Sequence, residues 1–409
     1  MLDLLEIILL LVALLMMIPI TVLFIECSAA WFGNLTQSPQ QKKVPTKTAI
    51  LIPAHNEATG IVQTIKTILP QLKPEDHLVI VADNCTDNTA TICRKTAAEY
   101  EQKLAVTVLE RTDLQLRGKG YALDYGLKFL AQDPPEIVIL VDADCIVHPG
   151  AIKELSTVAF HTDRPIQGNY LQEQPPNPSA KDLISTLAIL IKNLVRQQGL
   201  ANLGLPSLLY GTGMAFPWTV ISEAPLASGN IVEDMQLGID LALAGHSPLF
   251  YPGAKVTSTL PQQGEAATSQ RTRWEHGHLQ TLFTQVPKLI KASLQQKRFD
   301  LLTLALDLGV PPLSLLVMLW GVSTTFALMI AMVGLTWTPA LILASGGLLM
   351  VIAIVVSWAK FGRDTIPVST LWKVPVYLLW KIPLYLAFIF KPQKQWVRTD
   401  RDNPKSATS

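Results

Sequence analysis

The chain has 409 residues, enough for one large domain or two ordinary ones, and it carries 33 basic and 32 acidic side chains. A net charge of +1 excludes the strongly basic surface by which nucleic acids are bound, so no nucleic-acid partner is expected. Hydrophobic residues make up 49% of the chain and charged residues only 16%, which predicts that part of it lies in lipid. Its four cysteines form no C-x-x-C pair, which argues against a zinc or dithiol centre and for free thiols.

The first apolar segment, Leu4–Ile25, is long enough for a membrane-spanning helix. Its start carries Asp3 and Glu6 instead of the basic residues of a signal peptide, so we expect an uncleaved anchor over residues 1–30. Basic residues follow this anchor at Lys42, Lys43 and Lys47. By the positive-inside rule, they predict that the next domain is cytoplasmic and that the N-terminus lies outside.

Residues 45–285 are predicted to form an α/β domain. Three short runs are continuously apolar and rich in β-branched residues, as strands buried on both faces are: Ala49–Ile52, Leu78–Val81 and Ile137–Val141. Helical patterns over Gly60–Leu69 and Thr89–Tyr100 separate the first strands. This alternation predicts a Rossmann-like, mostly parallel sheet with helices on its faces.

Each of these strands leads into polar residues, at Pro53–Glu57, Asp83–Asp87 and Asp142–Asp144. A single acidic residue at such a place is usually a turn or helix-capping residue. Because open parallel sheets bind ligands at the carboxyl ends of their strands, the three clusters together predict one ligand site at that edge.

Asp142 and Asp144 are the strongest chemical signal, because two carboxylates after a buried strand are costly without a compensating charge. Mg²⁺ or Mn²⁺ supplies that charge and binds through one or two carboxylates together with substrate phosphates. Such an ion would stabilise the charge on a departing diphosphate. Arg117–Gly120 adds cations and flexible glycines where a diphosphate needs them, and the alternative is an ordinary basic turn.

Glu233 and Asp234 begin a helical pattern, where acidic residues are favourable in any case. The functional interpretation is that Asp234 is a general base, because a sugar hydroxyl must lose its proton as it attacks. Gln270–Trp274 follows, with Arg273 available for phosphate and Trp274 for a sugar face.

These motifs together, in this order, resemble the inverting family 2 glycosyltransferases, which have the GT-A fold. The resemblance covers about residues 48–284 and implies that Asp234 is the catalytic base and that Asp144, with Asp142 beside it, holds the metal. It implies a nucleotide-sugar site formed by Pro53, His55, Glu57, Asp83, Lys119, Asp142, Asp144, Gln270, Arg273 and Trp274. It implies an acceptor site formed by Gly211, Thr212, Gly213, Glu233 and Trp274.

The end of the chain is again apolar. Residues 286–310 are predicted to be an amphipathic, interfacial connection, and residues 311–358 two membrane-spanning helices, Leu313–Val333 and Pro339–Trp358. In residues 359–390, the segment Leu371–Phe390 carries a polar residue every fourth position, at Lys373, Tyr377, Lys381 and Tyr385. Such a stripe favours a helix along the cytoplasmic interface over a third span. Residues 391–409 form a basic, cytoplasmic tail.

The sequence therefore predicts a multi-pass protein of the cell's cytoplasmic membrane that transfers a sugar, with a UDP-sugar favoured as donor, to a lipid or glycan and forms a β-linkage. The alternative is the catalytic subunit of a processive polysaccharide synthase, for which partner subunits would be expected. A nucleotidyltransferase also uses paired carboxylates, but it gives no reason for Gln270–Trp274. A catalytically dead scaffold is disfavoured because every expected acidic residue is present. The sugar, the nucleotide and the acceptor are not encoded in any motif.

Overall fold

The computed structural model describes residues 2–33, 45–99, 104–175, 177–227, 232–259 and 264–390. The predictions made for Lys42, Lys43 and the tail 391–409 fall outside these residues. The chain divides into two compact units. We call them the sheet unit, with residues 34–176 and 206–277, and the helical unit, with residues 1–33, 177–205 and 278–392.

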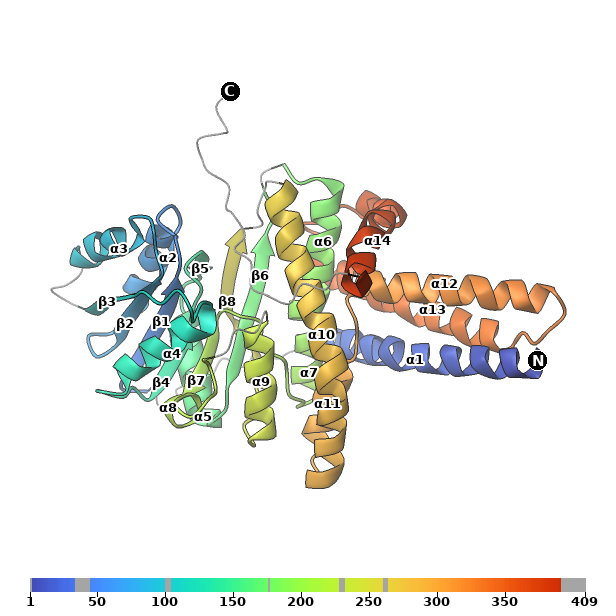
Figure 1. The fold of residues 1–409 in the computed structure, drawn as a ribbon, viewed down its shortest axis with the longest axis horizontal. Helices are drawn as coiled ribbons and strands as arrows, with labels where there is room; N and C mark the ends of the chain where they lie inside the picture. Colours follow the sequence, from blue (N-terminus) through green and yellow to red (C-terminus); the bar gives the residue numbers. More distant parts are fainter. Residues whose placement is uncertain are drawn as a thin grey trace. The chain divides into compact units, whose positions relative to one another are not determined.

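The sheet unit contains one sheet, whose described strands run in the order β3-β2-β1-β4-β7-β6-β8-β5 (Figure 1). Their bounds are β1 Thr48–Ala54, β2 His77–Asp83, β3 Ala105–Arg111, β4 Ile137–Leu140, β5 Cys145–Val147, β6 Ile166–Glu173, β7 Met214–Pro217 and β8 Leu249–Thr259. Strands β3, β2, β1 and β4 are parallel, as are β6 and β8, whereas β7 and β5 pair in antiparallel fashion. The predicted mostly parallel sheet is confirmed.

Helices cover both faces of this sheet because successive residues of its buried strands point to opposite sides. Ile50 and Ile52 face a core with Ile61 and Ile65, whereas Leu51 faces a second core on the other side. The first core is formed with α2 Ile61–Ile68, α3 Thr89–Ala98 and α5 Ala151–Thr162, and the second with α4 Lys119–Leu130, α8 Trp218–Ile221 and α9 Glu233–Leu243. A short 3₁₀ turn, η1 Leu69–Gln71, continues α2. The continuous apolar runs of the strands are therefore explained by burial on both faces.

The helical unit is built from segments that are far apart in the sequence. Its elements are α1 Leu2–Phe32, α6 Ala180–Leu190, the π-helical turn η2 Ile191–Val195, α7 Arg196–Asn202, α11 Phe299–Leu308, α12 Leu313–Met332, α13 Thr338–Ser357, the π-helical turn η3 Trp358–Gly362, the 3₁₀ turn η4 Val368–Lys373 and α14 Val374–Phe390. Helices α1, α12 and α13 pack alongside one another (Figure 1). The long helix α10, Gly264–Gln296, begins in the sheet unit and continues into the helical unit. Residues 177–205, which lie inside the predicted catalytic range 45–285, pack with the helical unit.

Four of the described helices are long and apolar enough to cross a membrane. They are Leu4–Phe32, Leu313–Met332, Thr338–Gly362 and Val368–Phe390, with mean hydropathies of 3.1, 2.0, 2.6 and 1.4. The first three coincide with the predicted spans. The fourth contains the segment that the sequence assigned to the interface.

Three of the four residues of the polar stripe lie on α14 and are buried inside the helical unit, whereas Lys373 ends η4 and is exposed. Tyr377 and Lys381 are 5% and 1% exposed. The Tyr377 hydroxyl contacts Ser185 Oγ on α6 at 3.1 Å, and the Tyr385 hydroxyl contacts Ser314 Oγ on α12 at 2.6 Å. The exposed side of α14 is apolar, with Val376, Leu379, Ile382, Leu386, Ile389 and Phe390. The two tyrosines of the stripe therefore find hydrogen-bond partners on neighbouring helices, which the sequence interpretation had not considered.

A buried ion cluster joins three segments of the helical unit. Arg196 of α7 donates through Nε to Glu26 Oε2 of α1 at 2.5 Å, and through Nη2 to Asp307 Oδ1 of α11 at 2.5 Å. All three residues are at most 5% exposed. A buried arginine that lost its acceptors would leave an uncompensated charge, which is strongly destabilising.

Candidate active site

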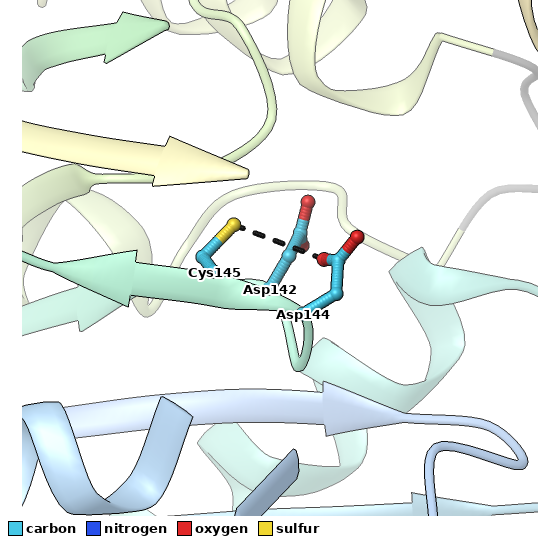
Figure 2. Close-up of side chains that lie close together, drawn as sticks. All are labelled: Asp142, Asp144 and Cys145. Carbon is cyan, nitrogen blue, oxygen red and sulfur yellow. Dashed lines mark hydrogen bonds between the residues drawn. The ribbon is translucent and has the colours of Figure 1, made fainter. Parts of the chain in front are cut away.

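Asp142 and Asp144 lie in the turn that joins β4 to β5. The turn is fixed by two hydrogen bonds: Asp142 N–H donates to Thr212 Oγ1 at 3.0 Å, and Cys145 N–H donates to the Asp142 carbonyl at 3.2 Å. One ligand atom from each of Asp142, Asp144 and Cys145 lies within 4.8 Å of the others (Figure 2). The two carboxylates that the sequence paired are thus brought together at the carboxyl end of the central strand.

The donor atoms of this cluster suit a hard divalent cation. Carboxylate oxygens are the ligands that Mg²⁺ and Mn²⁺ prefer, whereas a thiolate selects softer metals. Burial raises the pKa of the Cys145 thiol well above its usual value, with the Asp144 and Asp142 carboxylates adding to the effect, so the thiol stays protonated. The residues that fit Mg²⁺ or Mn²⁺ are therefore Asp142 and Asp144, with Cys145 as a neutral neighbour.

Lys119, at the N-terminus of α4, lies against this cluster. Its Nζ is 2.5 Å from Asp142 Oδ1 and donates to the Gly211 carbonyl at 2.5 Å. Burial alone would lower the pKa of this lysine, but the carboxylates of Asp142, Glu233 and Asp234 outweigh it and raise the pKa. Lys119 therefore remains a cation and neutralises part of the acidic cluster.

Glu233 and Asp234 begin α9, as the sequence predicted. Burial raises the pKa of Glu233 to about 7; the Lys119 cation opposes the shift and the Asp234 carboxylate adds to it. A methyl group added at Gly211 would lie 3.2 Å from Asp234 Oδ2 and 3.7 Å from Lys119 Nζ. Four residues thus lie close together: Asp234, Lys119, Gly211 and Asp142. The acidic residues that begin α9 therefore lie near the carboxylates of the turn between β4 and β5.

The segment 210–213 is held from beneath by Gln167 of β6, which is fully buried. Its side chain accepts from Tyr210 N–H at 2.7 Å and donates to the Thr212 carbonyl at 3.0 Å. The Thr212 side chain is itself fully buried and supports the Asp142 turn. Thr212 therefore supports the site from within and presents no exposed surface to an acceptor. Positive φ values at Gly211 and Gly213 explain why glycines flank it.

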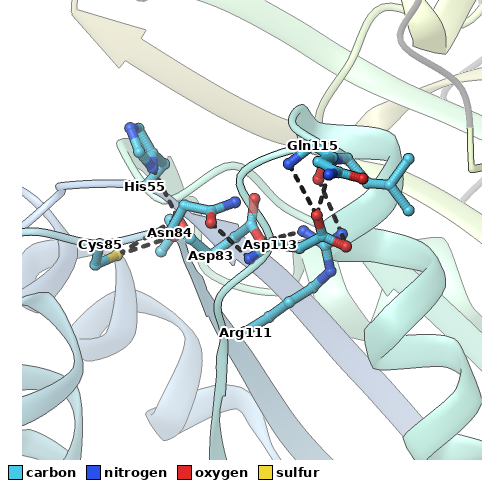
Figure 3. A network of polar contacts seen from close by, with 9 residues as sticks. His55, Asp83, Asn84, Cys85, Arg111, Asp113 and Gln115 are labelled. Carbon is cyan, nitrogen blue, oxygen red and sulfur yellow. Dashed lines mark hydrogen bonds and ion pairs between the residues drawn. The ribbon is translucent and has the colours of Figure 1, made fainter.

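A second polar network lies at the ends of β2 and β3 (Figure 3). Asp83, 5% exposed, accepts from Arg111 Nη1 at 2.6 Å, and the two residues are register partners on neighbouring strands. The His55 ring donates through Nδ1 to the Asp83 carbonyl at 2.7 Å, because that oxygen can only accept. Asn84 follows, and its Oδ1 accepts from Asp113 N–H at 2.8 Å.

The remaining predicted residues of the donor site are on β1, the loop after it and α10. Pro53 pairs with Val81 in the sheet, and Glu57 is 9% exposed with its backbone N–H donating to Thr89 Oγ1 at 2.8 Å. Gln270, Arg273 and Trp274 are half-buried on α10, where spacings of three and four residues put them on one face. The Nε of Arg273 is buried and has no hydrogen-bond partner among the described residues.

Sequence reasoning missed Arg111 and Gln167, whereas Asn84 lay within the predicted polar cluster Asp83–Asp87. Arg111 ends β3, so it carried the same signal as the other strand-end residues and was open to prediction. Gln167 lies within a strand, and nothing in its local pattern indicates that it supports another segment.

The sheet unit has the fold of the GT-A glycosyltransferases. A mannosyltransferase of Pyrobaculum calidifontis, PcManGT, solved with GDP-mannose and Mn²⁺, is similar in structure at a TM-score of 0.52 and 18% sequence identity. The match covers 86% of this chain and 99% of that one. At this identity, the likeness establishes the fold alone.

The family model described as "Glycosyltransferase like family 2" matches residues 45–277, and the chain belongs to this family. The "Probable glycosyltransferase YdaM" of Bacillus subtilis is 24% identical over 277 residues, which cover 66% of this chain and 63% of the relative. A poly-beta-1,6-N-acetyl-D-glucosamine synthase of Staphylococcus epidermidis is 24% identical over 254 residues, which cover 59% of this chain and 57% of that relative. The matched part is thus about six-tenths of the length of these relatives. The predicted family, enzyme class and fold are confirmed.

Proposed function

We propose that this protein transfers a sugar from a nucleotide-sugar, with a UDP-sugar favoured, to a lipid or glycan acceptor at the cytoplasmic face of the cell's cytoplasmic membrane. The observation that carries the proposal is the convergence of Asp142, Lys119, Gly211 and Asp234 at the carboxyl edge of the sheet. It combines a carboxylate site for a divalent cation, a fixed cation and a second carboxylate free for proton transfer.

In this mechanism, Asp234 removes the proton from the attacking hydroxyl of the acceptor. The acceptor oxygen forms a bond to the anomeric carbon as the bond from that carbon to the diphosphate breaks, so the configuration inverts and an α-linked donor gives a β-linkage. General base catalysis of this kind contributes about 10²–10⁴-fold to a rate. Asp234 suits this role because it begins α9 and its carboxylate lies beside Gly211 and Lys119.

Mg²⁺ or Mn²⁺, held by Asp144 and Asp142, would supply positive charge to the departing diphosphate. Arg273 and Lys119 provide the protein's own cations for the same group, and Trp274 provides a flat surface for a sugar. Asp83, with Glu57, holds the base and ribose. The buried, unpaired Nε of Arg273 supports its assignment to the donor phosphates.

The four apolar helices support a membrane-bound reaction with a lipid or lipid-linked glycan as acceptor. The poly-N-acetylglucosamine synthases among the relatives favour a second candidate, a processive synthase that lengthens a polysaccharide with the help of partner subunits. The two candidates share the same catalytic residues and differ in how many sugars are added to each acceptor.

The topology proposed from the sequence places the N-terminus outside and residues 45–285 and the tail inside, with Leu371–Phe390 at the interface. Burial of Lys381 removes much of the cost that argued against a span, because its charge does not face lipid. Labelling of a cysteine placed at Ser406 in intact cells decides whether this segment lies at the interface or spans the membrane. Reaction with an impermeant reagent from outside would show that α14 spans.

The proposal is tested by incubating purified membranes with a panel of nucleotide-sugars and analysing the products by mass spectrometry. We expect one nucleotide-sugar to give a sugar-bearing lipid or glycan, with the new bond in the β-configuration by NMR. Asp234→Asn membranes serve as the matched control and should form almost no product. Product from the control at the wild-type rate, or an α-linkage from an α-linked donor, would contradict the mechanism.

A further inference from the structure

The turn that carries Asp142 and Asp144 is held by two threonine hydroxyls that come from distant parts of the chain. Thr64 of α2 donates through Oγ1 to the Ala143 carbonyl at 2.8 Å, across 79 residues of sequence. Thr212 Oγ1 accepts from Asp142 N–H at 3.0 Å, across 70 residues. Both threonines are at most 1% exposed, so water does not compete for these hydrogen bonds.

Three consecutive peptide groups of the turn are each held by one hydrogen bond. The group before Asp142 is held by the Thr212 hydroxyl. The next group is held inside the turn, where the Asp142 carbonyl accepts from a backbone N–H at 3.2 Å. The third group joins Ala143 to Asp144, and Thr64 holds it through the Ala143 carbonyl. Because the backbone sets the direction of the side chain it carries, this last bond bears on how Asp144 presents its carboxylate.

The hydroxyl of Thr64 is not needed for packing. The buried residues of α2 are Ile61, Thr64, Ile65 and Ile68, and the three isoleucines belong to the first core of the sheet, together with Ala143. Valine has nearly the same shape as threonine and would fill this place without the cost of burying a hydroxyl. The hydroxyl therefore serves the turn rather than the core.

Thr67 lies one helical turn further along α2 and offers an internal comparison. Its Oγ1 donates to the Thr64 carbonyl at 2.8 Å and accepts from Val147 N–H of β5 at 3.2 Å. Both threonines thus attach α2 to the segment that follows β4. Thr64 contacts a peptide group that adjoins Asp144, whereas Thr67 contacts a strand three residues beyond it.

We propose that Thr64 is a positioning residue for the divalent cation: through the Ala143 carbonyl, it fixes the direction in which Asp144 offers its carboxylate. This inference rests on the metal site of the proposed function and deepens it. Without the hydroxyl, the Ala143 carbonyl would be buried with no donor from α2, an arrangement costly enough to turn the peptide group toward another donor. The backbone of Asp144 turns with it, and loss of a group that orients a ligand typically lowers metal affinity about 10–100-fold.

The test measures the affinity of full-length, detergent-purified protein for Mn²⁺ by calorimetry, alone and with UDP, with the EPR spectrum of the bound ion as a second readout. Thr64→Val should weaken Mn²⁺ binding about tenfold, the lower end of that range, because the contact acts through the backbone. Thr64→Ser keeps the hydroxyl and should restore the wild-type affinity. Thr64→Cys has a weaker donor, so its affinity should be intermediate, and it carries the comparison if Thr64→Val does not fold.

Thr67→Val is the matched control, because it removes a hydroxyl from the same helix. It should lower the melting temperature, as Thr64→Val does, but leave the Mn²⁺ affinity unchanged. The effect of Thr64→Val should also disappear in an Asp144→Asn background, because residues that act through one another are not additive.

Three results would overturn this inference alone: wild-type Mn²⁺ affinity in Thr64→Val, an equal loss of affinity in Thr67→Val, or a loss that persists in the Asp144→Asn background. A wild-type protein that binds no Mn²⁺, with or without UDP, overturns the metal site of the proposed function as well.

Discussion

Gly211→Ala tests whether the convergence of Lys119, Asp234 and the segment 210–213 is catalytic. Gly211 has a φ of +86°, and an added Cβ would lie 3.2 Å from Asp234 Oδ2. Two effects are expected. The positive φ costs alanine about 1–2 kcal/mol of stability. The methyl group also displaces the Asp234 carboxylate by a few tenths of an ångström.

Gly150→Ala separates these effects, because Gly150 has nearly the same φ, +82°, but no atom within 4 Å of an added Cβ. Both variants should lower the melting temperature by a similar amount. Only Gly211→Ala should lower turnover, by about 10- to 100-fold, since small displacements of catalytic groups are known to be this costly.

The assay is the initial rate of radiolabelled sugar transfer with donor and acceptor both saturating, alongside thermal unfolding of each variant. Saturation removes differences in binding, so the ratio of rates reports on the placement of Asp234. Equal loss of turnover in the two glycine variants, or normal turnover in Gly211→Ala, would refute the reasoning.

Three further predictions concern the same site. Asp234→Asn should lower kcat by about 10²–10⁴-fold while the donor's Kd stays near wild type, and a weakened donor affinity would argue for a donor contact instead. Chelation should stop turnover and added Mg²⁺ or Mn²⁺ should restore it, whereas full activity in excess chelator would refute metal dependence. Asp144→Asn should weaken the binding of Mn²⁺ as measured by calorimetry. Because Glu233 has a folded pKa of about 7, raised by burial, it binds a proton more tightly in the folded state. The stability that Glu233 contributes is therefore lost as pH rises through 7, so the metal-free protein should have a lower melting temperature at pH 8 than at pH 5. Glu233→Gln should reduce this difference in melting temperature. An unchanged difference would contradict the raised pKa of Glu233.

Much of the fold could be predicted because the signals are local. The apolar runs at Ala49–Ile52 and Ile137–Val141 are typical of strands buried on both faces, and these segments are strands β1 and β4. The association of residues 177–205 with the helical unit could not be predicted, because an amphipathic helix shows which face is buried but not what covers it. The stripe on α14 was interpreted as facing water for the same reason, although Ser185 and Ser314 cover its tyrosines.

Some features of the candidate site could likewise be predicted from the sequence, and others could not. Asp83, Asp142 and Asp144 could be expected to lie at one edge because the topology of a parallel sheet places the ends of its strands together. The pairing of Asp83 with Arg111 depends on the register between β2 and β3, which no pattern within either strand specifies. The hydrogen bond from Asp113 N–H to Asn84 Oδ1 depends on the conformation of the loop after β3, which no local pattern in the sequence specifies.

The buried ion cluster has a consequence for the order in which the protein is assembled. Glu26 lies in α1, which is synthesised before its partners: Arg196 comes 170 residues later, and Asp307 follows 111 residues after that. At about 5–20 residues per second, about 10–35 s pass before the ribosome has made the arginine. The nascent α1 must therefore hold a carboxyl group without its partner until about half of the 409 residues have been made. Final packing of the helical unit is thus a late event, and nascent chains that end before Asp307 are expected to be the forms that quality-control proteases remove.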